Sequence, residues 1–255
     1  MASELSETLG QLAGDPVPLV AMGGTIRNLA RAAQRLRGYP LEVMHGYFLR
    51  REDLEAVTEE LLARPARKRA AIPGISGDRA DIILAGALVF RFILREADRD
   101  GLWISGNGVR EGAFYTHFLP EPHLLPDVRR FAVENLAHQY LQPADHLRRV
   151  RRLARRLFEE MESLHGLGRR DAEPTLHDIG MTVGYHLHHK HGAYLVQAAR
   201  LNGYDHRDQA LLSMLVRYHR KGQPKLGPLS EVTHDGDDRV LAILAFCLRM
   251  AEMLE

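Results

Sequence analysis

The segment TLHDIGMTVGYHLHHKHGAYLV, residues 175–196, holds a His-Asp pair, His177 and Asp178, followed by four more histidines. Imidazole and carboxylate side chains ligate divalent metal ions when they meet on the buried sides of their elements. The same side chains on a solvated helix face would have no such role. The spacing of the surrounding apolar residues therefore has to distinguish a metal site from a polar helix surface.

Helical spacing directs further ionisable residues toward the same interior. His146 lies four residues before Val150, in line with the apolar stripe Val150, Leu153 and Leu157 of a helix expected over residues 143–161. His219 and Glu252 each continue the apolar stripe of a later helix. An ionisable side chain at the end of such a stripe needs a partner if it is buried. The candidate metal ligands are His146, His177, Asp178, His219 and Glu252.

Mixed imidazole and carboxylate ligands suit a hard or borderline ion such as Mg²⁺, Mn²⁺, Fe²⁺ or Zn²⁺. Such an ion can hold a phosphate and lower the pKa of a bound water, and His177 and Asp178 would then be catalytic. The alternative is that each histidine is hydrogen-bonded in the core without an ion. His186, His188 and His189 are expected on the surface or in contact with anions, and His191 is the best of them for a role beside the metal or a phosphate.

A second candidate site is a glycine turn in the first half of the chain. The strand-like run at 17–22 enters Gly23, Gly24 and Thr25, and helical spacing follows. Two glycines between a strand and a helix let backbone N–H groups approach an anion, and the helix dipole favours negative charge there. This arrangement predicts a phosphate site, although a tight turn without a ligand is the simpler alternative.

Two cationic segments are further candidates for contact with phosphate. The segment GNGVREG, residues 106–112, supplies a flexible loop with the cation Arg110, whose alternative role is a surface ion pair with Glu111. Residues 148–156 hold six arginines in nine positions, which is typical of a solvated helix face.

Strand and helix patterns alternate up to about residue 118, with strands expected near 17–22, 41–49 and 102–105, and they predict an α/β domain. Prolines in residues 119–128 mark a linker. Beyond the linker no strand pattern follows, so residues 128–255 are predicted to be helical.

Composition excludes several classes of protein. The chain has 255 residues, a formal net charge of +1 and 45% apolar residues, which is sufficient for two domains with ordinary cores. The single cysteine, Cys247, fits a reducing compartment and a place in the core. We expect a cytoplasmic protein, because the sequence shows neither a secretory signal nor a membrane-spanning run. The net charge gives no reason to expect a nucleic-acid partner.

Several segments together resemble the Ppx/GppA family of exopolyphosphatases and guanosine pentaphosphate phosphohydrolases. The matching segments are VAMGGTIRNLA, MHGYFLRREDLE, RADIILAGALV, GVREGAF, LHDIGMTVGYHLHHKHGAYLV and LVRYHRKG. The resemblance implies release of terminal phosphate from inorganic polyphosphate, or of the 5′-phosphate of guanosine pentaphosphate, with Mg²⁺ or a similar ion such as Mn²⁺. It also implies a homodimer.

The resemblance also implies a domain organisation. Residues 15–118 are similar to the family's second actin-like ATPase-type (RNase H-like) domain, with Gly23, Gly24 and Thr25 as its phosphate loop. Residues 128–255 are similar to a helical HD-phosphohydrolase-type domain, truncated at its C-terminus, in which Glu252 occupies the place of an Asp. The family's first actin-like domain, with its water-activating glutamate, has no counterpart here, so a fragment of a longer protein is expected.

Three functions remain open at this point. The first is the substrate-binding and helical part of an exopolyphosphatase-type enzyme, with Arg148, Arg152 and Lys190 along the route of a long polyanion. The second is metal-dependent hydrolysis by the HD-type site itself. The third is a non-catalytic polyanion-binding or dimerisation module.

Overall fold

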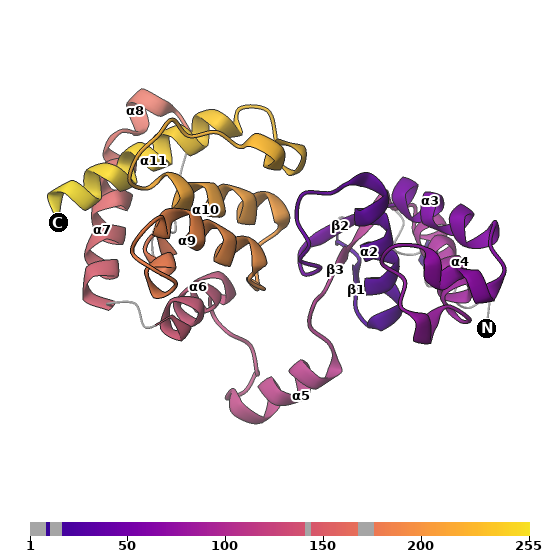
Figure 1. The fold of residues 1–255 in the computed structure, drawn as a ribbon. Helices are drawn as coiled ribbons and strands as arrows, with labels where there is room; N and C mark the ends of the chain where they lie inside the picture. Colours follow the sequence, from indigo (N-terminus) through magenta and orange to yellow (C-terminus); the bar gives the residue numbers. More distant parts are fainter. Residues whose placement is uncertain (1–8, 11–16, 141–143, 168–175) are drawn as a thin grey trace. The chain divides into compact units, whose positions relative to one another are not determined.

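The computed structural model describes residues 9–10, 17–140, 144–167 and 176–255 (Figure 1). The chain divides into two compact units, Met1–Leu124 and Leu125–Glu255. The division falls within the proline-containing segment 119–128. Among the helices that the structure describes, none combines the length and the apolar character of a membrane span.

The first unit is a small sheet covered by helices. Its elements are β1 (Val20–Ala21), α2 (Gly24–Arg37), β2 (Tyr47–Arg50), α3 (Arg51–Leu62), the 3-10 helices η1 (Ala66–Ala71) and η2 (Gly77–Arg79), α4 (Ile83–Glu96), β3 (Gly101–Ile104) and α5 (Val109–Phe118). The strand order is β1-β3-β2, and β3 pairs in parallel with β1 and antiparallel with β2. Helix α2 packs on β2, β3, α3 and α4, and the core of the unit lies between them (Figure 1).

Three sequence expectations for this unit need correction. The strand expected near 41–49 is paired only at Tyr47–Arg50. The strand expected over 17–22 is paired only at Val20–Ala21, because β1 is an edge strand with one neighbour and the positive φ of Gly23 (110°) turns the chain directly after Met22. Residues 106–112, expected to form a flexible loop, are partly helical. The backbone N–H of Gly108 donates to the Glu111 carboxylate at 2.8 Å, and this contact starts α5 at Val109.

The described residues of the second unit form helices and turns without a strand, as the sequence predicts. The helices are α6 (Val128–Gln139), α7 (Ala144–Glu160), α8 (Glu162–His165), η4 (Ile179–Thr182), α9 (His188–Ala198), α10 (His206–Tyr218), η5 (Gly227–Val232) and α11 (Asp237–Leu254). Helix α11 packs along α7, and α9 packs on η4 and α10 (Figure 1).

The apolar stripe of α7 differs in register from the expected one. Its buried residues are Leu147, Val150, Ala154 and Phe158, whereas Leu153 and Leu157 are half-buried. His146, near the N-terminal end of α7, is half-buried and still borders the buried side of this helix. The arginines of this helix occupy its exposed side, apart from the half-buried Arg151.

Two glycines let η4 lie directly on α9. A Cβ atom at Gly180 would stand 1.9 Å from the carbonyl oxygen of His188 and 2.4 Å from the backbone nitrogen of Gly192. A Cβ atom at Gly192 would stand 2.8 Å from Cγ1 of Val216 on α10. The main chains of η4 and α9 therefore touch, and this contact fixes the distance between the turn before η4 and the start of α9.

The contact between η4 and α9 predicts that a single added methyl group lowers the stability of the protein strongly. Gly180→Ala should destabilise the protein by about 1–3 kcal/mol or more, because the clash is with backbone atoms that cannot rotate away. Urea unfolding followed by far-ultraviolet circular dichroism measures the change. Gly184→Ala is the matched control, since a Cβ atom there meets open space. Equal effects of the two substitutions would contradict the packing argument.

Candidate metal centre

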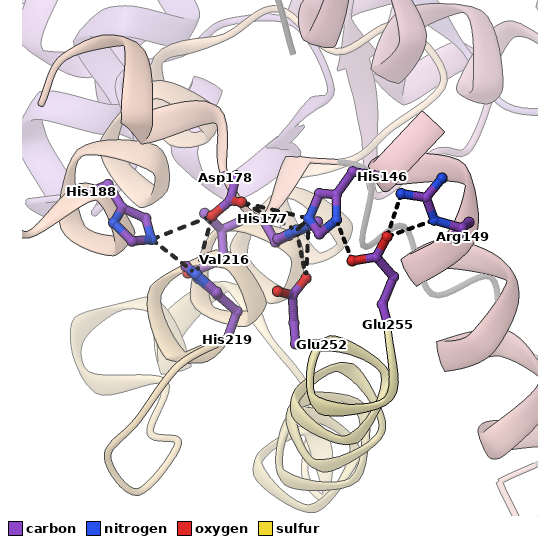
Figure 2. A network of polar contacts seen from close by, with 9 residues as sticks. All are labelled: His146, Arg149, His177, Asp178, His188, Val216, His219, Glu252 and Glu255. Carbon is purple, nitrogen blue, oxygen red and sulfur yellow. Dashed lines mark hydrogen bonds and ion pairs between the residues drawn. The ribbon is translucent and has the colours of Figure 1, made fainter. Parts of the chain in front are cut away.

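Four histidines and two carboxylates from separate elements meet inside the helical unit (Figure 2). They are His146 of α7, His177 and Asp178 before η4, His188 at the start of α9, His219 after α10 and Glu252 in the last turn of α11. His177, His188 and His219 are buried, with exposed fractions of 0, 3 and 2%. All five candidate metal ligands named from the sequence are thus brought together, along with one residue that was not among them.

Asp178 lies at the middle of the cluster and faces different histidines with its two oxygens. Oδ1 is 3.3 Å from Nε2 of His188 and 3.5 Å from Nε2 of His219. Oδ2 is 3.6 Å from Nε2 of His177 and 3.7 Å from Nε2 of His146. The carboxylate therefore separates two groups of donor atoms, each of which contains two imidazole nitrogens (Figure 2).

The first group combines His146, His177 and Glu252. The Nε2 atoms of the two histidines are 3.2 Å apart, and Oε1 of Glu252 is 2.7 Å from Nε2 of His177. Nδ1 of His146 donates to Glu255 at 3.0 Å, and Arg149 holds the same carboxylate. In the neutral ring with its proton on Nδ1, Nε2 of His146 would present its lone pair to the cluster. Glu255 was not expected in this group from the sequence, because it follows an apolar stripe without belonging to one.

The second group contains His188, which was expected on the surface and is instead buried. Nδ1 of His188 donates to the backbone carbonyl of Tyr185 at 3.0 Å, and its Nε2 is 3.1 Å from Nε2 of His219. Helix α9 begins directly after Leu187, a left-handed residue with a φ of 61°. This backbone turn aims His188 inward, and no apolar periodicity in the sequence signals it.

The histidines favour the ionised form of Asp178. Burial by itself would raise the pKa of this carboxyl group. A hydrogen bond with His219 and the charges of His177, His219 and His188 outweigh burial and lower the pKa of Asp178 from 3.8 to about 2. A permanent negative charge is therefore held between the two pairs of imidazoles.

The polar atoms of the first group fit a divalent ion. Oε1 of Glu252 is buried and has no hydrogen-bond partner within the part of the chain that the structure describes. Its 2.7 Å approach to His177 lacks the geometry of a hydrogen bond. A buried carboxylate oxygen without a donor is unfavourable unless a cation satisfies it. An ion held by His146, His177, Asp178 and Glu252 would do so.

The other residues expected in the helical site lie outside this cluster of described contacts. His186, Lys190 and Arg152 are exposed, and His189 and His191 are half-buried on or beside α9. Arg148 is exposed and pairs with Asp145 of the same helix. These side chains remain available for solvent or an anion.

In the first unit, the glycine turn and the following loop are tied together by one arginine. Arg27 of α2 donates to the carbonyl oxygens of Gly23 at 3.1 Å and Gly106 at 3.2 Å. Gly23 begins α2 without a side-chain cap, so the first N–H groups of a 14-residue helix face this turn. A Cβ atom at Gly24 would meet the Arg79 guanidinium at 2.6 Å, which places a second cation beside the turn.

Thr25 and Arg110 differ in their surroundings. Thr25 is half-buried, and its methyl group lies against Gly86 of α4. Arg110 is exposed on α5, and the expected partner Glu111 instead accepts from the Gly108 backbone. Arg27 and Arg79, which the sequence analysis did not single out, are thus the cations that lie at the turn.

The chain joins an α/β unit that carries a glycine turn to a helical unit that carries a cluster of histidines and carboxylates. Residues 3–121 match the Ppx/GppA phosphatase family, and residues 128–255 match Ppx/GppA phosphatase, domain III. The chain belongs to the Ppx/GppA phosphatase family.

Individual relatives share 25–27% sequence identity with the parts of this chain that they match. The guanosine-5′-triphosphate,3′-diphosphate pyrophosphatase of Pseudoalteromonas translucida (strain TAC 125) is 25% identical over 180 residues, which cover 68% of this chain and 36% of that protein. The crystal structure of the Aquifex aeolicus Ppx/GppA family member is 27% identical, with a TM-score of 0.41 and 48% and 40% of the two chains covered. A type II variant of the Aquifex aeolicus Ppx/GppA phosphatase is 26% identical, with a TM-score of 0.40, and covers 46% and 39%.

The position of Asp178 predicts a dependence of stability on pH. In metal-free protein, its ionised form stabilises the folded state by about 2 kcal/mol, and this contribution is present above pH 4 and lost as the pH falls toward 2, because the pKa is lower in the folded state. Urea unfolding of the wild type and of Asp178→Asn at pH 5, 4 and 3 measures it. The stability gap between the two should narrow toward acid. A gap that stays constant would show that Asp178 titrates normally.

Proposed function

We propose that this chain works in a phosphohydrolase that releases terminal phosphate from inorganic polyphosphate or the 5′-phosphate of guanosine pentaphosphate. The proposal is supported by the family match over both units. One geometric observation carries it: the uncapped start of α2 at Gly23, with the Arg27 and Arg79 side chains beside it. In both substrates the released phosphate is attached through an anhydride oxygen, and such a turn can hold the free oxygens of this phosphate.

The residues of the turn would orient the substrate. Backbone N–H groups of Gly24 and Thr25, together with the Thr25 hydroxyl, would bind oxygens of a phosphate and stabilise the charge that builds up as the phosphorus is attacked. Arg27 would keep the turn and the loop at Gly106 at a fixed separation. The exposed Arg148, Arg152 and Lys190 of the helical unit would attract a long polyanion, an interaction that salt weakens.

A hydroxyl deletion tests the phosphate turn. Thr25→Val keeps the shape of the side chain and removes its hydroxyl, so it should weaken binding of inorganic polyphosphate about tenfold, the size expected for one hydrogen bond to a charged group. Titration calorimetry at several salt concentrations measures the affinity.

Thr116→Val, on the exposed face of α5, is the matched control and should leave the affinity unchanged. If Arg152→Gln or Lys190→Gln weakens binding and Thr25→Val does not, polyphosphate binds to the helical unit and the proposed role of the turn is wrong.

A second candidate function belongs to the helical unit, where His146, His177, Asp178 and Glu252 would hold Mg²⁺ or Mn²⁺. The buried oxygen of Glu252 that lacks a hydrogen bond favours this function. When bound, such an ion would polarise a phosphoryl oxygen and lower the pKa of a water. Glu255 would hold the ring of His146, and Asp178 would supply the negative charge. This arrangement corresponds to a metal-dependent phosphohydrolase of the HD type.

Metal content tests the second function. Purified protein dialysed against Mn²⁺ should retain the ion and release phosphate from p-nitrophenyl phosphate, and Asp178→Asn should lose both properties because it removes the central charge. Asp145→Asn, the same change on the exposed side of α7, is the control and should keep them. Metal-free wild-type protein without turnover would leave the cluster with a structural role and would favour a non-catalytic module.

A further inference from the structure

We propose that the first unit has a separate binding site for a nucleoside monophosphate, in a pocket at the C-terminal end of α2. The pocket has a volume of about 510 Å³, which is within the range of small-molecule sites in proteins. Gln34 in its wall lies about 15 Å along the helix from Gly24, so the pocket is distinct from the glycine turn at the other end of α2. The pocket is lined by Arg31, Gln34, Arg35, Gly38, Tyr39, Leu41 and Glu42.

A buried amide in the pocket wall indicates a ligand with an N–H donor. Gln34 is 4% exposed, and its Nε2 donates to the backbone carbonyl oxygen of Val43 at 3.3 Å. A carbonyl oxygen only accepts, so this bond fixes which end of the amide is the nitrogen. The other end, Oε1, accepts no hydrogen bond from the residues that the structure describes. A buried acceptor without a donor is unfavourable, and an N–H group of a ligand in the pocket would satisfy it.

The arginines of the pocket indicate that the same ligand carries an anionic group. Arg31 is exposed, and no hydrogen bond or ion pair joins its side chain to another described residue. Arg35 pairs with Glu42 at 2.9 Å, but both side chains are more than half exposed, so this pair is weak. Two arginines and one glutamate leave an excess of one positive charge, which complements a phosphate group.

The remaining wall of the pocket is aromatic and apolar. The rings of Tyr39 and Tyr47 have centroids 4.9 Å apart at an interplanar angle of 73°, and this contact holds Tyr39 in place. Leu41 is buried beside it. A planar base can stack on such a tyrosine ring. A nucleoside monophosphate with an amino group on its base thus matches the amide, the aromatic wall and the arginines, whereas inorganic phosphate matches only the arginines.

Titration calorimetry of the full chain with adenosine 5′-monophosphate, without added metal ions, tests the proposal. Ribose 5-phosphate, which lacks the base, should bind about tenfold more weakly, the size expected for one stacked base. Arg31→Gln should weaken binding of the nucleotide about tenfold, because it removes a charged contact with the phosphate. Arg67→Gln, an exposed arginine of η1 outside the pocket, is the matched control and should leave the affinity unchanged.

The buried amide has a test of its own. Gln34→Met keeps a side chain of similar size and removes the acceptor. It should weaken binding of adenosine 5′-monophosphate and leave the affinity for ribose 5-phosphate unchanged. A variant with a misfolded pocket would lose affinity for both ligands, so the comparison separates loss of the acceptor from a folding defect. An unchanged affinity of Gln34→Met for the nucleotide would overturn the proposed recognition of the base.

Three other results would overturn the proposal. Equal affinities of the wild type for adenosine 5′-monophosphate and ribose 5-phosphate would show that no base is recognised. Absence of nucleotide binding, or equal effects of Arg31→Gln and Arg67→Gln, would show that the pocket is not the site. Weaker nucleotide binding in Thr25→Val would place the nucleotide at the glycine turn instead. Binding of inorganic polyphosphate is measured separately, so a failure here leaves the proposed role of the turn intact.

Discussion

The negative charge of Asp178 is the constraint around which the helical unit is arranged. Imidazoles from α7, the turn before η4, the start of α9 and the end of α10 all face this one carboxylate. Without a central anion, four imidazoles in a largely buried space would have to compete for protons or remain unpaired. Each helix therefore has a definite position along its own axis, because a shift by one residue would turn its histidine away from Asp178.

The candidate sites of the two units present different chemical groups to a ligand. In the first, main-chain N–H groups at the start of α2 and the side chains of Arg27 and Arg79 present positive charge at the turn. In the second, acceptors dominate: imidazole lone pairs and carboxylates converge on one place. One arrangement is complementary to an anion and the other to cations. The chain spans 36% of the length of the Pseudoalteromonas relative.

The sequence predicted those features that have a periodic signal. His219 and Glu252 continue buried apolar stripes, and His146 borders one, so amphipathic spacing was sufficient to bring them together with His177 and Asp178. His188 has no such signal, because a left-handed residue at the first turn of α9 sets its direction. The start of α5 was missed for a similar reason, since a side chain three residues later, Glu111, caps it. Tertiary contacts such as Arg79 on Gly24 have no local pattern at all.

The main-chain contact between η4 and α9 would have a consequence for ion selectivity in the metal centre proposed for the helical unit. Gly180 and Gly192 leave no side chain between the two backbones, so the separation of Asp178 and His188 is set by peptide groups instead of by flexible side chains. A site of fixed width cannot expand or contract around whatever ion is present. Rigid sites discriminate by radius and preferred coordination number, whereas flexible sites discriminate mainly by charge. The absence of side chains at Gly180 and Gly192 would thus act as a size filter.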